Sequence, residues 1–267
     1  MVLNKPKMQD VLWKRTPDWF KPWFNTEAYH LLYGHRSEQE AHAFVDNLAE
    51  ANLLGSPGAL LDAGCGSGRH ARAFAKHGWN VTGMDLSPNS IAAAKAESSA
   101  TDEITYVVGD VRKLHQQVEW EGRFDAVTSL FTSIGYFESD AEHLNVFRGF
   151  ESVLKPGGHV IIDFLNAPAV LEHLVEHETI EKEGVTFTIH RRHHDGWIEK
   201  SIQFEWRGEA AHHVERVRAL DQSHFKQCFD QAGLELVHVC GDAFLQPWTP
   251  QSPRLVVLGK KPIPSAS

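Results

Sequence analysis

The chain has 267 residues, of which 42% are hydrophobic and 23% charged, and this composition excludes a disordered or fibrous protein. Its 26 basic and 35 acidic side chains give a net charge of −9, which argues against a broad surface for nucleic acid. No apolar run approaches the roughly 20 residues that cross a bilayer, and we expect no secretory signal. Three cysteines without paired spacing favour the reducing cytoplasm, so we expect a cytoplasmic protein.

The first 36 residues are rich in aromatic side chains and are interrupted by Pro17 and Pro22, which predicts short helices. Ser37 followed by Glu40 has the spacing of a capping box, and apolar residues then recur at helical spacing. We therefore expect a helical lid over residues 1–56, which ends in a glycine- and proline-containing turn.

Strand and helix patterns alternate after this lid. The predicted strands cover residues 59–62, 79–84, 104–108, 124–130, 159–165, 234–240 and 254–260. Helices are predicted between them, among them one that begins at Ser87-Pro88, with the serine as N-cap. This order predicts an α/β fold with a doubly wound, Rossmann-like sheet of seven strands, mainly parallel. Its core is assigned to residues 57–166 and 221–262.

The pattern changes between residues 167 and 220. Apolar and polar residues alternate there from about Thr179, and Asp195-Gly196 is suited to a hairpin turn. We therefore expect an antiparallel β insertion over residues 167–220, which serves either as a substrate cover or as a dimer contact.

The strongest local signal is the glycine-rich segment of residues 60–69, which lies between a strand and a helix, where open α/β sheets bind ligands. Its glycines permit positive φ and a close approach of the backbone to a ligand. Residues 66–71 also fit the dinucleotide pattern, so an NAD(P)-dependent oxidoreductase is an alternative. Asp85, at the end of the second strand, suits the ribose of either ligand. Asp62 discriminates between them, because a carboxylate there would repel a pyrophosphate but suits an ammonium group.

Five motifs in register resemble the class I S-adenosylmethionine-dependent methyltransferases. Listed in order, they cover residues 62–68, 81–87, 108–111, 124–127 and 154–158. The resemblance covers most of the chain and implies S-adenosyl-L-methionine as cofactor and S-adenosyl-L-homocysteine as product. It also implies that Asp85 holds the ribose and that Asp110 contacts the adenine amino group.

The cofactor-binding residues that this resemblance implies lie in the lid, in the glycine turn and after the next three strands. They are Tyr29, Arg36, Asp62, Gly64, Cys65, Gly66, Arg69, Asp85, Leu86, Ser87, Gly109, Asp110, Val111, Leu130 and Phe131. Arg36 is suited to pair with the carboxylate of the cofactor. Cys65 is interpreted as a small buried thiol rather than a reactive one.

Within this superfamily, residues 130–137 and the insertion are similar to small-molecule N-methyltransferases of the amino-sugar and glycine or sarcosine types. We expect methyl transfer to a small molecule, with an amine as the favoured acceptor, by in-line displacement without a metal. Oxygen and sulfur acceptors stay open, because Tyr136 stands where the amino-sugar enzymes tend to carry histidine. Tyr136 and Tyr33 are the candidate catalytic residues, as groups that take a proton or orient a lone pair. Each has a second interpretation, Tyr136 as a pocket wall and Tyr33, with Tyr29, as core packing.

The remaining expectations concern metals, the acid Asp163 and binding partners. The chain has 17 histidines, but without zinc-like spacing they predict no metal site. Asp163 either faces the site or is a structural acid. We expect neither nucleic acid nor membrane as a partner, and a monomer or a homodimer. A protein that binds the cofactor without catalysis is the remaining alternative.

Overall fold

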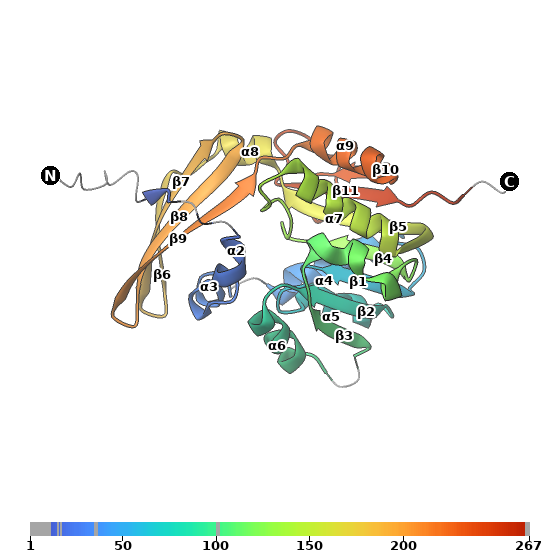
Figure 1. Ribbon diagram of the computed structural model, residues 1–267, viewed down its shortest axis with the longest axis horizontal. Coiled ribbons are helices and arrows are strands. Elements are labelled where there is room, and N and C mark those ends of the chain that lie inside the picture. The colour runs from blue at the N-terminus through green and yellow to red at the C-terminus, as the bar shows by residue number, and fades with distance from the viewer. Residues whose placement is uncertain (1–11, 15, 17, 35–36, 100–101, 265–267) are drawn as a thin grey trace. The chain divides into compact units, whose positions relative to one another are not determined.

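The computed structural model describes residues 12–14, 16, 18–34, 37–99 and 102–264. It divides into two compact units, Met1–His35 with Leu171–Ala219 and Arg36–Val170 with Leu220–Ser267. Each unit has a sheet of its own (Figure 1). Within the described ranges, no helix is long and apolar enough to cross a membrane.

The larger unit is built around a seven-stranded sheet with the order β10-β11-β5-β4-β1-β2-β3. Its elements are α4 (Glu38–Glu50), β1 (Ala59–Ala63), α5 (Arg69–Lys76), β2 (Asn80–Asp85), α6 (Pro88–Glu97), β3 (Ile104–Val108), η1 (Val111–Gln116), η2 (Val118–Trp120), β4 (Phe124–Ser129), α7 (Asp140–Val153), β5 (Leu154–Leu165), α9 (Gln222–Ala232), β10 (Glu235–Cys240) and β11 (Arg254–Lys260). Strands β1 to β5 pair in parallel, and β11 is antiparallel to both of its neighbours. This sheet confirms the predicted α/β fold.

The strand order places the ligand-binding end of this sheet. The chain moves from β1 to β2 and β3 on one side, and it returns to place β4 and β5 on the other side of β1. Ligands of open α/β sheets bind at such a reversal, outside the carboxyl ends of the strands. The segments that follow β1 and β4 therefore border the expected site.

Helices cover both faces of the sheet (Figure 1). Phe44 of α4, Phe74 of α5 and Ile91 of α6 belong to one buried apolar cluster with alternate strand residues. On the other face, the Phe147 ring of α7 lies 5.5 Å from the Phe229 ring of α9, centroid to centroid. The sheet is thus buried on both sides, which explains the nearly continuous apolar runs of its strands.

Local signals set the element ends. The Ser37 and Ser87 hydroxyls accept hydrogen bonds from backbone N–H groups three residues later, as predicted, and Pro88 follows Ser87 at the first helical position. One boundary differs from the prediction. Strand β5 begins at Leu154, which pairs with Phe124, and the register then shifts before the strand continues from His159.

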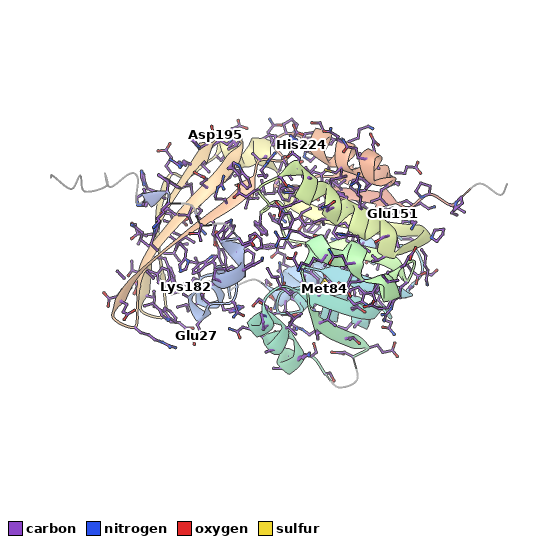
Figure 2. The ribbon with its side chains drawn as sticks, viewed as in Figure 1. Glu27, Met84, Glu151, Lys182, Asp195 and His224 are labelled. Carbon is purple, nitrogen blue, oxygen red and sulfur yellow. The ribbon has the colours of Figure 1, made fainter. Side chains whose placement is uncertain are left out.

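The smaller unit contains α2 (Phe20–Trp23), α3 (Glu27–Tyr33) and a four-stranded antiparallel sheet. Its strands are β6 (His177–Lys182), β7 (Val185–His194), β8 (Trp197–Trp206) and β9 (Glu209–Arg218), in chain order. Asp195, labelled in Figure 2, and Gly196 form the predicted hairpin turn, both with positive φ. Helix α8 (Ala167–Glu172) runs across the boundary between the units. The roles of lid, cover or dimer contact stay predictions.

A buried carboxylate links three strands of the smaller sheet. Glu199 of β8 is fully buried, and it accepts hydrogen bonds from Arg216 Nε at 3.0 Å and from Arg192 Nε at 2.7 Å. We expect Glu199→Ala to lower the free energy of unfolding by about 3–5 kcal/mol, because it leaves two guanidinium groups without their counter-charge. Urea denaturation measures this change. Glu205→Ala, an exposed change on the same strand, is the control, and an equal loss there would refute the expectation.

Candidate functional site

The glycine turn that follows β1 is held against β2 by backbone hydrogen bonds. Gly64, Gly66 and Gly68 have φ values of 85°, 55° and 82°, which favour glycine. The N–H groups of Gly64 and Cys65 donate to the carbonyl oxygen of Met84, at 2.7 and 3.0 Å. Met84 lies in the sheet of the larger unit, where Figure 2 labels it. The turn therefore has a fixed place at the carboxyl ends of β1 and β2.

The three glycines of this turn meet different surroundings. A Cβ on Gly64 would lie 2.5 Å from Ser133 Cβ, and one on Gly68 would collide with the Tyr106 hydroxyl. A Cβ on Gly66 would have nothing within 4 Å. Gly64 and Gly68 are thus required by protein packing, whereas the turn is open to a ligand at Gly66.

Asp85 connects the end of β2 with the turn. Its two carboxylate oxygens accept hydrogen bonds from the N–H groups of Gly66 and Ser87, each at 2.8 Å. The carboxylate is partly exposed, and a carboxylate oxygen can accept more than one hydrogen bond. It can therefore accept hydrogen bonds from a pair of hydroxyl groups on a ligand beside Gly66.

Asp62 is the buried acid of the site. Its side chain is 1% exposed, and Oδ1 accepts a hydrogen bond from Thr128 Oγ1 at 3.1 Å. Oδ2 has no hydrogen-bond partner in the part of the chain that the structure describes. Burial, with a smaller contribution from the charge of Asp85, raises the pKa of Asp62 to about 7. An unsatisfied buried carboxylate oxygen suits a cationic hydrogen-bond donor and disfavours a phosphate.

The end of β3 carries a second acid. The Asp110 carboxylate accepts from the backbone N–H of Arg112 at 3.1 Å and from its guanidinium, with Nη2 at 2.7 Å. Arg112 Nη1 also donates to Glu142 of α7 at 2.9 Å. The N–H of Gly109 donates to the Asp85 carbonyl oxygen at 2.9 Å, which ties the ends of β2 and β3 together. Asp110 and Asp85 thus lie on neighbouring strand ends.

The segment after β4 closes the other side of the turn. Ser133 Oγ hydrogen-bonds to the Ala63 carbonyl oxygen at 3.2 Å and to Ser129 Oγ at 2.8 Å. The Tyr136 hydroxyl donates to the Thr132 carbonyl oxygen. Leu130 lies in the buried apolar core cluster. This segment therefore contacts β1 through Ser133, and the Thr132 carbonyl group holds the Tyr136 hydroxyl.

Arg69 and Cys65 are both buried. Arg69 is 7% exposed, donates to the Ser37 carbonyl oxygen at 3.2 Å and lies over the Phe131 ring, 4.4 Å from its centroid. Burial raises the pKa of the Cys65 thiol well above its ordinary value, which agrees with the interpretation of a small packed thiol.

Two of the remaining predicted residues, Tyr29 and Tyr33, belong to the smaller unit. The Tyr33 hydroxyl donates to the Glu215 carboxylate at 2.7 Å and accepts from Lys200 Nζ at 2.5 Å. The Tyr29 ring packs 4.9 Å from that of Tyr33. Helix α3 ends at Tyr33, and Arg36 lies outside the described residues. The cofactor contacts of Tyr29 and Arg36 and the catalytic roles of Tyr33 and Tyr136 stay predictions.

Comparisons with known proteins identify this architecture. A family model described as a methyltransferase domain matches residues 60–158, which include the glycine turn, Asp85 and Asp110. This chain is an S-adenosylmethionine-dependent methyltransferase. The enzyme is 25% identical over 216 residues to the putative methyltransferase YqeM of Bacillus subtilis, a match that covers 78% of this chain and 86% of the relative.

Two further relatives match the methyltransferase over shorter stretches. It is 37% identical over 112 residues to a ubiquinone biosynthesis O-methyltransferase of Xanthomonas campestris, which covers 41% of this chain and 44% of the relative. It is 30% identical over 142 residues to a dTDP-3-amino-3,4,6-trideoxy-alpha-D-glucopyranose N,N-dimethyltransferase of Streptomyces venezuelae. This match covers 52% of this chain and 56% of the relative.

Solved structures share the fold of the methyltransferase. A S-adenosylmethionine-dependent methyltransferase from Clostridium acetobutylicum has a TM-score of 0.72 at 16% identity, over 87% of this chain and 95% of that one. DesVI of Streptomyces venezuelae has a TM-score of 0.63 at 22% identity, over 89% and 97%.

The donor set of the methyltransferase fits its cofactor. The unsatisfied Asp62 Oδ2 suits the ammonium group of S-adenosylmethionine, and the partly exposed Asp85 carboxylate suits its ribose hydroxyls. Because the cofactor is S-adenosylmethionine and the chain is an enzyme, the nicotinamide alternative and the non-catalytic alternative are wrong.

Sequence reasoning missed the groups that hold these acids. Thr128 is fully buried and donates to Asp62 Oδ1, and Arg112 holds Asp110. Arg112 lies only two residues beyond Asp110, so the spacing was a usable signal. For Thr128, the sequence offers only a hydroxyl within an apolar strand, and its partner comes from the pairing of β1 with β4.

The open side of the turn yields a test. We expect Gly66→Ala to weaken the binding of S-adenosylhomocysteine at least about 10-fold, because the methyl group projects where the ligand approaches. The matched control is Gly122→Ala, since Gly122 has a φ of 57°, close to the 55° of Gly66, and an equally open surrounding. Both variants carry a strain of about 1–2 kcal/mol. Calorimetric titration that shows equal affinities in the two variants would refute the open-side assignment.

Proposed function

We propose that the methyltransferase transfers the methyl group to the nitrogen of a small-molecule amine by in-line displacement. The observation that carries the proposal is the chemistry of residues 130–137, which follow β4 beside the glycine turn. The polar side chains of this segment are the hydroxyls of Thr132, Ser133 and Tyr136, and it contains no histidine, lysine or carboxylate. The segment thus offers no strong base.

Each of these three hydroxyls is already engaged with the protein. Thr132 Oγ1 accepts from the N–H of Leu165 at 3.1 Å, and Ser133 Oγ bonds to Ala63 and Ser129. The Tyr136 hydroxyl donates a hydrogen bond to the Thr132 carbonyl oxygen. An alcohol acceptor needs a base to become a strong nucleophile, whereas a neutral amine already has a nucleophilic lone pair. This difference supports an amine.

The residues then have separate tasks. When bound, S-adenosylmethionine supplies a methyl group activated by its positively charged sulfur, and the C–S electron pair stays on sulfur as nitrogen bonds to the methyl carbon. Asp62 and Asp85 hold the amino-acid and ribose ends, so the methyl group has a fixed position. The Tyr136 hydroxyl points its hydrogen toward the Thr132 carbonyl oxygen. Its oxygen therefore accepts a hydrogen bond from an N–H of the amine, and this contact orients the nitrogen lone pair toward the methyl group. The proton released from nitrogen passes to solvent.

The comparisons support the same choice. The relative that acts on an amino sugar matches 142 residues of this chain, whereas the O-methyltransferase matches 112 residues and less than half of its own length. We therefore propose an amine of the amino-sugar class as the first acceptor to test.

Matched acceptor pairs test the proposal. The enzyme is incubated with S-adenosylmethionine carrying a deuterated methyl group and with amino sugars, each paired with the sugar that has a hydroxyl in place of the amine. Mass spectrometry should find the label on the amino sugar and none on its hydroxyl partner. The rate should rise with pH as the acceptor ammonium loses its proton. Label on the hydroxyl sugars alone would overturn the proposal.

A further inference from the structure

Two consecutive residues after β4 have an unusual backbone conformation. Phe131 and Thr132 have φ values of 58° and 60°, in the left-handed region that bulky and β-branched residues rarely occupy. Such a conformation persists only where the surrounding structure holds it. The contacts that hold this pair therefore determine the position of the segment that follows, including Tyr136.

Strand β5 holds both residues. Asp163 Oδ2 accepts a hydrogen bond from the N–H of Phe131 at 2.9 Å, and the Asp163 carbonyl oxygen accepts one from the N–H of Thr132, also at 2.9 Å. Thr132 Oγ1 accepts in turn from the N–H of Leu165 at 3.1 Å. The left-handed pair is thus attached to two positions of one strand.

Arg254 of β11 fixes the carboxylate that makes this attachment. Its Nε donates to Asp163 Oδ1 at 2.7 Å and its Nη2 to Oδ2 at 2.6 Å, a two-point contact. The Asp163 side chain is 8% exposed. The Arg254 guanidinium also lies 4.9 Å from the centroid of the Phe131 ring. One arginine therefore contacts both the acid and the residue that the acid holds.

We propose that Asp163 and Arg254 are positioning residues for methyl transfer. They fix the backbone of Phe131 and Thr132, and the Thr132 carbonyl oxygen in turn fixes the hydroxyl of Tyr136. Neither residue is required to touch the acceptor. This inference rests on the proposed function, in which Tyr136 orients the acceptor.

The proposal predicts a separation of transfer from cofactor binding. Asp62, Asp85 and Asp110 belong to β1, β2 and the segment after β3, so their contacts do not depend on Asp163. We expect Asp163→Asn and Arg254→Met each to lower kcat by about 10- to 100-fold, as small misplacements of reacting groups do. The Kd of S-adenosylhomocysteine should change through Phe131, the implied cofactor residue that Asp163 contacts, but much less than kcat does, because the three acids keep their places. Arg254→Lys, which keeps the charge but loses the two-point contact, should recover only part of kcat.

A neighbouring ion pair provides the control. Asp125, near the start of β4, accepts the N–H of Ala59 at 2.8 Å and pairs with Lys155 at 2.8 Å. Asp125→Asn removes a similar charge from an acid that also holds a backbone N–H. Asp125 lies near the start of β4, however, whereas Phe131 and Thr132 follow the end of that strand. Asp125→Asn should reduce stability and leave kcat within about 2-fold. An equal loss of kcat in the Asp125 and Asp163 variants would overturn the proposal, because the effect would then be general destabilisation.

Two further measurements test the link from Asp163 to Tyr136, and the second of them needs no acceptor. In a double-mutant cycle, Tyr136→Phe and Asp163→Asn should be less than additive in kcat, since both act through the Thr132 carbonyl group; additive effects would count against the proposal. Amide hydrogen exchange of residues 130–137 should accelerate in Asp163→Asn and not in Asp125→Asn, and unchanged exchange would refute it. If the wild-type enzyme methylates oxygen alone, the proposed function is wrong. The kcat values of the variants are then compared with that oxygen acceptor, and the positioning proposal is tested separately.

Discussion

Asp85→Ala is expected to lower the affinity for S-adenosylhomocysteine by about 100- to 1000-fold. The carboxylate fixes the N–H groups of Gly66 and Ser87, and in the proposed complex it also accepts the ribose hydroxyls. A hydrogen bond to a charged group contributes about 1.5–3 kcal/mol, and two of them near the lower end of that range account for this factor. Calorimetric titration of the folded variant measures it.

Two further variants serve as controls for Asp85→Ala. Asp85→Asn keeps one oxygen acceptor and should lose less affinity than the alanine variant. Asp230→Ala, a change of the same kind on an exposed face of α9, should leave the affinity unchanged. If Asp85→Ala binds within about 3-fold of the wild type, the placement of the ribose at β2 is wrong.

The affinity for S-adenosylhomocysteine should also fall about 10-fold between pH 8 and pH 6. Burial raises the pKa of Asp62 to about 7, so at pH 6 only about a tenth of the free protein carries the carboxylate that the ammonium group needs. Asp62→Asn removes the charge at every pH. It should lower the affinity about 100-fold at pH 8, as the loss of one partner of a buried charge pair does. It should also abolish the pH dependence.

The same residue has the opposite effect on the stability of the ligand-free protein. The pKa of Asp62 is raised above its ordinary value of 3.8, so the folded state retains a proton that the unfolded state has lost. The contribution of Asp62 to stability is therefore complete below about pH 4 and declines until about pH 7. Asp62→Asn should raise the stability at pH 8 while it weakens binding. Urea denaturation at pH 5 and pH 8 measures this, and a variant that is less stable at pH 8 would contradict it.

The sequence was sufficient to predict the strands and helices of the larger unit and the acidic residues at its strand ends. The strands are nearly continuous apolar runs bounded by glycine, proline or a serine N-cap, so their ends agree with the prediction to within one or two residues, apart from the start of β5. Asp62 and Asp85 lie at strand ends, and the parallel order of β1 and β2 brings these ends together. Local patterns of this kind need no knowledge of distant segments.

The partners of those acids were not predictable in the same way. Asp163 had two interpretations from its sequence position, and the choice depends on Arg254, which lies 91 residues away. Only the antiparallel register of β11 with β5, which pairs Val256 with Asp163, places this arginine beside the acid. The conformation of Phe131 likewise has no sequence signal, because glycine is the residue that normally reports positive φ.

The smaller unit joins chain segments that are made at different times. Trp23 donates its indole N–H to Glu215, which is 192 residues further along the chain, and its ring stacks on His213. At a synthesis rate of roughly 5–20 residues per second, about 10–40 s pass before the ribosome has made this partner. The aromatic side chains of α2 and α3 therefore emerge long before the surface that buries them. On the nascent chain, they are exposed to chaperones and to aggregation throughout that interval.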